Sequence, residues 1–375
     1  MPRIPDELPS SVLERIAFLD GLRGVAILWV VLFHVFVRWT QIVPYGEKYA
    51  DISWIAHGWL GVELFFMISG FVIFMTLERS KSLFEFLIRR WLRLFPAMLV
   101  CSILVYASAA FVPERPAGNP SIRDLLPGLT FIEPALWARV LRSPQGLIEG
   151  AFWSLFVEVK FYVIAGSCYF LVGAHRTVLC IIALFAYGTS VAYLVAISPE
   201  LDLQRLQTLN DVFAAQHFGW FASGALFYMN SRTSSLGALV AAVCVGLFAA
   251  FLQQGIARDG MIFSLLTVAL FASGVLFPQA RWIFANTLLI FIGTISYPLY
   301  LIHENMIVAL VVKIGTAWPW LPTWAMPIMP FFVVVILAWL VTKYVEPTMK
   351  RFLTRVLVAI KLYRPSSGQA HSSSI

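Results

Sequence analysis

The chain has 375 residues, of which 60% are hydrophobic and 13% are charged, and its formal net charge is +7. Soluble domains are about half apolar and about a quarter charged, so this composition excludes an ordinary soluble domain and indicates an integral membrane protein. A positive charge also occurs in nucleic-acid-binding proteins. Here the basic residues lie between apolar segments, which is typical of membrane topology signals and argues against a nucleic-acid partner.

Ten apolar segments follow one another along the chain, and most approach the roughly 20 residues that a membrane-spanning helix requires. They cover residues 16–37, 58–77, 91–112, 151–172, 178–197, 212–229, 236–252, 261–277, 283–312 and 326–345. The sixth and seventh are short and give the weakest signal. The pattern predicts an all-α integral membrane fold, a bundle of about ten transmembrane helices.

The distribution of basic residues predicts how the chain is oriented. They gather before the first span, in alternate loops and after the last span, at Arg3, Arg15, Arg79, Lys81, Arg89, Arg90, Arg93, Arg176, Arg232, Arg281, Lys350, Arg351, Arg355, Lys361 and Arg364. Because Lys and Arg are enriched in short cytoplasmic loops, we predict that both termini are cytoplasmic. Residues 1–15 then form a cytoplasmic N-terminal segment, 16–347 the membrane domain, and 348–375 a basic tail with a disordered end.

Segments outside this pattern add three expectations. Residues 113–150 form the longest outer segment, long enough to serve as a functional cap or lid. Cys101, Cys168, Cys180 and Cys244 lie in apolar runs, so we expect small buried residues rather than disulfides or metal ligands, and we predict no metal site. The polar start of the chain precedes an apolar run that is too long for a cleavable signal peptide.

The first span, FLDGLRGVAILWVVLFHVF, carries Asp20, Arg23 and His34 inside an apolar run. Arg23 and His34 are 11 residues apart, close to three helical turns, so they share one helix face about 16 Å apart. One interpretation is that Arg23 snorkels at the helix end beside Asp20 and that His34 is a packed histidine. The other is a polar stripe, with Arg23 near the cytoplasm and His34 near the outer side.

Polar residues in two other spans favour the second interpretation. GVELFFMISGF places Glu63 near the outer side and Ser69 deeper in the same span. FWSLFVEVKFY places Glu158 about one turn after Ser154. Lys160 is expected either to pair with a neighbouring carboxylate or to reach elsewhere in the bundle. An unpaired charge inside the bilayer costs about 2.5–3.5 kcal/mol on insertion scales. Several such residues at similar depth therefore suggest one water-accessible cavity.

The ninth segment adds a third polar face. In GTISYPLYLIHEN, Ser296, Tyr300 and His303 stand at positions i, i+4 and i+7, which is one face of a helix. Pro298, inside the same segment, is expected to loosen the local hydrogen-bond ladder. His303 then falls in the outer half of the membrane.

The basic cluster RRWLRLFP begins the third span. Simple marking of the cytoplasmic side is a sufficient explanation for it. Arg90 and Arg93 are nevertheless one turn apart and are expected to face together. A pair of arginines in that geometry can hold phosphates bidentately, which lysines do not.

Five of these segments resemble, in the same order along the chain, the motifs of the acyltransferase-3 family. They are RGVAILWVVLFH, GVELFFMISGF, RRWLRLFP, WSLFVE and ISYPLYLIH. Members of this family are integral-membrane acyltransferases that modify O-antigens, exopolysaccharides, lipid-linked sugars, Nod factors and macrolides. The resemblance extends from about Phe18 to Pro347, so the domain 16–347 is expected to be the membrane acyltransferase domain. Glu63 stands where many members have Asp. Some members also append an extracytoplasmic hydrolase-like domain, which we do not expect here.

The resemblance implies transfer of an acyl group from cytoplasmic acyl-CoA to a hydroxyl of a cell-envelope or secreted carbohydrate or glycolipid. Acetyl-CoA is the default donor, and neither acyl group nor acceptor is specified by the sequence. Histidine suits the role of base, and the thioester oxyanion needs a donor. The implied location is a bacterial inner membrane, among membrane lipid and polysaccharide-biosynthesis partners.

The implied residue roles follow the family motifs. They are, for catalysis, His34, Arg23, Glu158 and His303; for the donor, Arg90, Arg93, Arg23 and Ser69; and for the acceptor, Glu63, Trp153, Ser154 and Tyr300. Either Glu158 or Glu63 would orient His34, as a carboxylate does in a catalytic dyad. The sequence leaves that choice open.

Two other classes remain as alternatives. A secondary transporter would also have about ten spans and charges near the midplane, but it favours inverted repeats, and none is visible. A non-enzymatic protein of an envelope complex would not need a basic cluster at the inner mouth and a histidine at the outer one. Transfer or hydrolysis of labelled acyl-CoA by the purified protein separates these alternatives from an enzyme.

Overall fold

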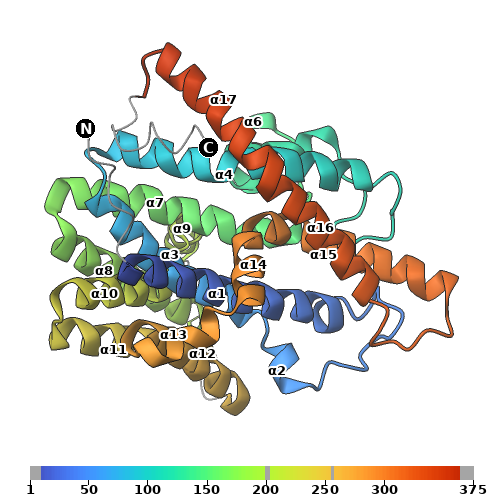
Figure 1. Cartoon of the computed structure of the whole chain (residues 1–375), viewed down its shortest axis with the longest axis horizontal. Helices are drawn as coiled ribbons and strands as arrows, with labels where there is room; N and C mark the ends of the chain where they lie inside the picture. Colours follow the sequence, from blue (N-terminus) through green and yellow to red (C-terminus); the bar gives the residue numbers. More distant parts are fainter. Residues whose placement is uncertain (1–9, 199–202, 255–256, 364–375) are drawn as a thin grey trace, which may run out of the picture. The chain divides into compact units, whose positions relative to one another are not determined.

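The computed structural model describes residues 10–198, 203–254 and 257–363 (Figure 1). Throughout these ranges the regular structure is helical and contains no strand, which confirms the predicted all-α class. The described parts of Met1–Val37, Tyr49–Met75 and Ala174–Ser296 form a first compact unit. A second compact unit is made from the described parts of Arg38–Lys48, Thr76–Gly173 and Tyr297–Ile375.

The first unit contains helices from each of its three stretches of sequence. They are α1 (Ser10–Phe33), α2 (Ser53–Ala56), α3 (Leu60–Glu78, whose last turn belongs to the second unit), α8 (Ala174–Ile197), α9 (Gln204–Phe213), η4 (Ala215–His217), α10 (Phe218–Thr233), α11 (Leu236–Gln254), α12 (Arg258–Leu276), α13 (Pro278–Phe284) and α14 (Thr287–Thr294). A π-helical turn, η1 (His34–Arg38), follows α1. Within this unit α1 packs on α14, and α10 on α11.

The second unit contains several long helices and the short helices of the segment 113–150. Its elements are α4 (Leu83–Ser108), η2 (Ile122–Asp124), α5 (Leu125–Thr130), α6 (Pro134–Leu141), η3 (Gly150–Phe152), α7 (Trp153–Val172), α15 (Ser296–Ala317), α16 (Ile328–Leu340), η5 (Val341–Val345) and α17 (Glu346–Ala359). Helix α4 contacts α5, α7 and α17. The turn η5 is π-helical and joins α16 to α17 without a break.

Nine helices in the described part of the chain are long and apolar enough to cross a membrane. They are Ala17–Arg38, Leu60–Glu78, Leu83–Ser108, Gly150–Val172, Ala174–Ile197, Leu236–Gln253, Arg258–Leu276, Ser296–Ala317 and Ile328–Ala359. The fold is therefore a multi-pass integral membrane bundle, as predicted. The cytoplasmic position of both termini stays a prediction.

Two predicted spans differ from the helices that form. The segment 212–229 is not one span: Ala214 has a φ of 52°, a 3-10 turn follows, and α10 then runs for 16 residues that are mostly buried. The segment 283–312 is divided among α13, α14 and α15. Asn286 accepts a hydrogen bond from the Leu288 N–H (2.8 Å) and so starts α14 as a separate helix.

Local capping chemistry explains two further differences. Ser82 accepts a hydrogen bond from the Glu85 N–H (3.2 Å), so α4 begins at Leu83 and the arginines of RRWLRLFP lie inside a helix rather than in a loop. Pro298 lies in the first turn of α15. The missing proline N–H has no intrahelical partner to lose there, so the expectation that Pro298 loosens a helix interior is wrong.

The four cysteines differ in how far they are buried. All four are free thiols; Cys101 is buried, whereas Cys244 is exposed on α11. The expectation that all four are buried is therefore wrong. In a membrane bundle the outward face is as apolar as the core, so an apolar run does not indicate which side a residue faces.

Helices α1 and α14 approach each other through glycine. A Cβ atom at Gly293 would lie 1.7 Å from the main-chain oxygen of Asp20, and one at Gly24 would lie 2.3 Å from the oxygen of Leu289. Such contacts are with backbone, which cannot rotate away. Small residues thus allow the main chains to pack closely, as in other membrane helix pairs.

We expect Gly293→Ala to separate α1 from α14 and to lower stability by roughly 1–3 kcal/mol, the usual cost of overpacking. The measurement is the melting temperature in detergent together with the folded yield. Gly237→Ala is the control, because a Cβ at Gly237 meets only the Ser235 Oγ at 3.7 Å. Equal melting temperatures for the two variants would contradict the close packing.

Candidate active site

His34 lies where α1 ends and the π-helical turn η1 begins. Its Nδ1 is 2.9 Å from the main-chain oxygen of Val30. A carbonyl only accepts hydrogen bonds, so in the neutral ring Nδ1 carries the proton and Nε2 carries the lone pair. The partner of Nδ1 is thus a main-chain carbonyl rather than a carboxylate. The resulting tautomer is the one a general base acting through Nε2 requires, and π-turns are frequent at functional sites.

Arg23 is paired on its own helix. Its Nη1 lies 2.6 Å from the Asp20 Oδ1, and both side chains are about one quarter exposed (26% and 25%). Between Arg23 and His34, the side chains of Ile27 and Val30 are fully buried. The face of α1 that joins the two polar residues is therefore packed against neighbouring helices, and polar groups stand only at its two ends.

Glu63 lies in a buried polar network of the first unit. Its Oε1 accepts a hydrogen bond from the Gln253 Nε2 (2.7 Å) and is 3.9 Å from the His217 Nδ1. The Gln253 Oε1 in turn accepts from the Trp220 Nε1 (3.0 Å). Glu63 is 1% exposed. The network joins α3 to η4, α10 and α11.

Helix α3 directs Glu63 away from α1. A Cβ atom at Gly61 would lie 2.4 Å from the main-chain oxygen of Ala26, so Gly61 marks the face of α3 that meets α1. Glu63 is two residues, or about 200°, further around the helix. Its contacts with Gln253 and His217 lie on that far face. This geometry argues against Glu63 as the carboxylate that orients His34. Ser69, further along α3, is buried.

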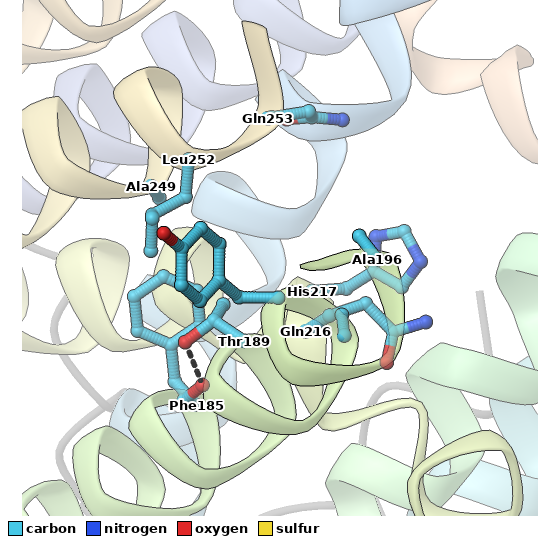
Figure 2. Close-up of a pocket in the computed structure, with 10 residues that line it drawn as sticks. Phe185, Thr189, Ala196, Gln216, His217, Ala249, Leu252 and Gln253 are labelled. Atoms are coloured by element: carbon cyan, nitrogen blue, oxygen red, sulfur yellow. Dashed lines mark hydrogen bonds between the residues drawn. The ribbon is translucent and has the colours of Figure 1, made fainter. Parts of the chain in front are cut away.

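A cavity of about 380 Å³ opens beside this network (Figure 2). Its lining residues come from α8, η4 and α11: Phe185, Thr189, Ala192, Tyr193, Ala196, Gln216, His217, Ala249, Leu252 and Gln253. Figure 2 shows Gln216 and His217 side by side on η4, with Ala249, Leu252 and Gln253 along α11. The lining is mainly apolar with a few polar groups, which is the usual make-up of a ligand pocket. The buried Glu63 thus reaches the cavity through two polar side chains.

In the second unit, Tyr162 links Glu158 to Arg90. The Tyr162 hydroxyl donates to the Glu158 Oε1 (2.6 Å), and the Arg90 guanidinium lies over the Tyr162 ring, 5.5 Å from its centre. Arg90 also donates to the Thr76 hydroxyl. Of the two alternatives for Lys160, pairing with a carboxylate is the one observed: its partner, 2.5 Å away, is Glu133 of the segment 113–150. Glu158 and Arg90, from separate sequence motifs, are therefore brought together.

Arg93 points to different partners from Arg90. Its Nη1 lies 3.6 Å from the Glu346 Oε2, and its guanidinium lies over the Tyr297 ring at 5.7 Å. The Arg93 side chain is 45% exposed. Arg90 and Arg93 thus contact different aromatic rings, and a joint phosphate site made by the two arginines stays a prediction.

Ser154, Tyr300 and His303 form a third polar group, at the starts of α7 and α15. The Ser154 and Tyr300 hydroxyls are 2.7 Å apart, and either can donate to the other. Both hydroxyls also contact the Ala151 oxygen, at 3.3 Å and 2.9 Å. The His303 Nδ1 is 2.9 Å from the Tyr300 main-chain oxygen, so this imidazole has the same tautomer as His34. His303 is fully buried, whereas Trp153 is 41% exposed.

Comparison with known proteins now decides the family. Residues 16–343 match the family described as an acyltransferase domain, which is most of the chain. The chain belongs to the acyltransferase-3 family. The resemblance drawn from the five sequence motifs is thereby confirmed, and the protein carries an acyltransferase domain within its membrane bundle.

Similar proteins carry the name O-acetyltransferase. The acyltransferase domain is 25% identical over 326 residues to the peptidoglycan O-acetyltransferase OatA of Listeria monocytogenes, covering 77% of this chain and 49% of that protein. It is also 28% identical over 160 residues to the O-acetyltransferase OatA of Staphylococcus aureus, covering 39% of this chain and 23% of that protein. The chain thus spans about half the length of the first relative. No solved structure matches it.

The predicted site residues of the acyltransferase domain divide between the two units. The first unit holds Arg23, His34, Glu63 and Ser69; the second holds Arg90, Arg93, Trp153, Ser154, Glu158, Tyr300 and His303. The Nδ1 of a predicted catalytic histidine contacts a main-chain carbonyl in each unit, His34 in the first and His303 in the second, and His57 makes the same kind of contact in the first unit. Among the described residues, no group of three or more metal-ligating side chains is close enough to hold a metal.

Sequence reasoning missed a pair of buried carboxyl groups in the acyltransferase domain. Glu304 accepts from the Trp39 Nε1 (3.0 Å) and the Ala151 N–H (2.7 Å). Glu149 accepts from the Asn305 N–H (3.0 Å) and Nδ2 (2.8 Å). The signal was present in the letters HEN at the end of GTISYPLYLIHEN, because a Glu and an Asn directly after His303 in an apolar helix need buried partners.

Burial raises the pKa of Glu149 well above its ordinary 4.5, and the neighbouring Glu304 adds to the rise, while Asn305 and Arg115 oppose it. The folded state therefore holds a proton that the unfolded chain releases. This contribution to stability is complete below about pH 4.5 and is lost as the pH rises toward the raised pKa. We expect Glu149→Gln to flatten the decline of the melting temperature with pH. Glu114→Gln, in the same segment but exposed, should keep the wild-type slope.

Proposed function

We propose that this protein transfers an acyl group, most simply acetyl, from cytoplasmic acyl-CoA to a hydroxyl of a cell-envelope carbohydrate or glycolipid. The acyltransferase-3 family and the O-acetyltransferase names of similar proteins support this function. The observation that carries it is the tautomer of His34, fixed through Nδ1 at the start of a π-turn. The proposed site of action is a bacterial inner membrane, alongside the polysaccharide-biosynthesis machinery.

In the proposed reaction, His34 Nε2 takes the proton from the acceptor hydroxyl. The hydroxyl oxygen then attacks the thioester carbonyl, a C–O bond forms, and the C–S bond to coenzyme A breaks. The proton held by His34 passes to the departing thiolate. An imidazole can accept a proton and then donate it, so His34 serves both steps, first as base and then as acid.

The other residues have binding roles in this proposal. Arg23, Arg90, Arg93 and Ser69 bind the donor, because guanidinium groups match the phosphates of coenzyme A. Glu63, Trp153, Ser154 and Tyr300 bind the acceptor, and Glu158 and His303 complete the catalytic set. Support comes from the polar group that joins Ser154, Tyr300 and His303 and from the contact of Arg90 and Glu158 with one tyrosine.

The test uses the purified full chain in proteoliposomes with labelled acetyl-CoA. Release of free coenzyme A that depends on added carbohydrate, with the label recovered in an ester, supports the proposal. In parallel, the envelope polysaccharides of cells with and without the gene are compared for ester-linked acyl groups. If folded protein neither transfers nor hydrolyses the acyl group, and the polysaccharides are unchanged, the proposed function is wrong.

A further inference from the structure

The ion pair between Arg93 and Glu346 is incomplete. The Arg93 Nη1 lies 3.6 Å from the Glu346 Oε2, whereas a charge-assisted hydrogen bond is about 2.7–2.9 Å long. The other carboxylate oxygen, Oε1, is buried and has no hydrogen-bond partner. Buried polar atoms are rarely left without a partner. The long distance and the unsatisfied oxygen indicate an ion pair that can dissociate when another anion binds to Arg93.

Helix geometry supplies a second partner for the glutamate. Glu346 is the first residue of α17, directly after the π-turn η5. Lys350 is four residues later on the same helix face, with Glu before Lys, which is the favourable order for such a pair. Both Lys350 and Arg93 interact electrostatically with Glu346. Two cations thus compete for one carboxylate, and the cluster has one positive charge in excess.

We propose that, before the donor binds, the Glu346 carboxylate occupies the position beside Arg93 that a phosphate of acyl-CoA takes. The phosphate then displaces Glu346 from Arg93, and the released carboxylate pairs with Lys350. This rests on the proposed function, since it requires that Arg93 binds a phosphate of coenzyme A. No covalent bond changes in the exchange. Each carboxylate and guanidinium has a partner of opposite charge before and after the donor binds.

The surroundings of Arg93 suit such an exchange. Its side chain is nearly half exposed, and its guanidinium lies over the Tyr297 ring at 5.7 Å. The Tyr297 hydroxyl donates to the Leu94 oxygen (3.1 Å), which fixes the ring. The arginine therefore keeps an aromatic contact while its anionic partner changes. The returning Glu346 also competes with the product, so it favours release of coenzyme A.

The test measures the dissociation constants of coenzyme A and of adenosine 3′,5′-bisphosphate for the full chain in nanodiscs of zwitterionic lipid, by calorimetry. Glu346→Gln is expected to tighten both by up to about 5-fold, the size of a partly exposed ion pair. Glu346→Asp, whose carboxylate reaches less far, should tighten them to a smaller extent. Lys350→Met should weaken both in the wild-type background and have no effect when combined with Glu346→Gln.

Arg355→Met is the matched control, because it removes a cation from the opposite, exposed face of α17. It should leave both constants unchanged. Equal weakening by Lys350→Met with and without Glu346→Gln would place Lys350 directly on the phosphate and overturn the exchange. Unchanged affinity in folded Glu346→Gln and Glu346→Asp would overturn it as well.

Two further comparisons distinguish failure of the proposed exchange at Glu346 from failure of the proposed function. If the folded wild-type chain binds no coenzyme A, the proposed function fails and the exchange with it. If the wild type binds and the Glu346 variants do not differ, only the exchange fails. Nanodiscs with an anionic lipid test the other source of phosphate: an effect of Glu346→Gln seen only there would assign the anion to a lipid and overturn the donor assignment.

Discussion

Replacing His34 with alanine is expected to abolish acyl transfer while membrane insertion and folding persist. In the proposed reaction the imidazole is the base, and loss of a general base typically costs about 10²- to 10⁴-fold in rate. The fold should survive because His34 is only partly buried and its Nδ1 contacts a carbonyl of its own helix. The measurement is the initial rate of ester formation from labelled acetyl-CoA, with the melting temperature taken on the same samples.

Two variants make this result specific. His34→Asn retains a side-chain N–H that can reach the Val30 oxygen but has no basic nitrogen, so it should fold and remain inactive. His57 makes the same kind of contact, with its Nδ1 2.7 Å from the Ser53 oxygen one turn earlier. His57→Ala should therefore keep the wild-type rate. A wild-type rate in His34→Ala, or equal losses in His34→Ala and His57→Ala, would contradict the role of His34.

Replacing Arg115 with methionine should destabilise the second unit by on the order of 3 kcal/mol. Arg115 is 4% exposed, and it donates to the Val105 oxygen (2.7 Å) and to the Ile148 oxygen (2.7 Å). Hydrogen bonds from a charged group contribute about 1.5–3 kcal/mol each. The Val105 and Ile148 oxygens each keep one other donor, the Ser108 hydroxyl (2.8 Å) and the Asn305 Nδ2 (2.8 Å), so the expected loss is that of the two charged hydrogen bonds alone. The loss should appear as a lower melting temperature and as faster protease cleavage within residues 113–150.

Arg123→Met, in the same segment but exposed, is the control and should change neither quantity. The two variants remove the same charge from the same loop, so any difference between them reports the buried hydrogen bonds. Identical cleavage patterns would mean that Arg115 does not hold the segment. The segment would then have to be fixed by other contacts, such as the bond from the Ala117 N–H to the Asn305 Oδ1 (2.9 Å).

Local patterns in the sequence predicted a good part of this molecule. Apolar runs of sufficient length predicted the helices, because a membrane span satisfies its backbone hydrogen bonds within itself. Spacing of i, i+4 and i+7 placed Ser296, Tyr300 and His303 on one face, and Tyr300 and His303 do occupy one polar group with Ser154. Both inferences depend only on helix geometry, which residues close in sequence determine.

Contacts between distant residues were not predictable in the same way. Glu63 and Gln253 are 190 residues apart and meet only because α3 and α11 lie in one unit. No periodicity marks such a meeting, since lipid-facing and buried positions are equally apolar. Residue-level detail at helix ends also escaped, as at Pro298, because the start of a helix depends on a few capping residues rather than on average hydropathy.

Because a π-turn follows α1, the number of residues between His34 and Arg38 is as important for the local structure as which residues they are. A π-turn accommodates one residue more than an α-turn of the same kind. Deleting one residue between positions 35 and 38 would replace the π-turn with an α-turn. Such a deletion removes only an apolar or surface residue, yet it would change the backbone around His34 and the direction in which the chain leaves α1. Chimeras that exchange the first helix between family members should therefore be joined beyond Arg38, and alignments that place a gap inside the turn will misassign the residues after His34.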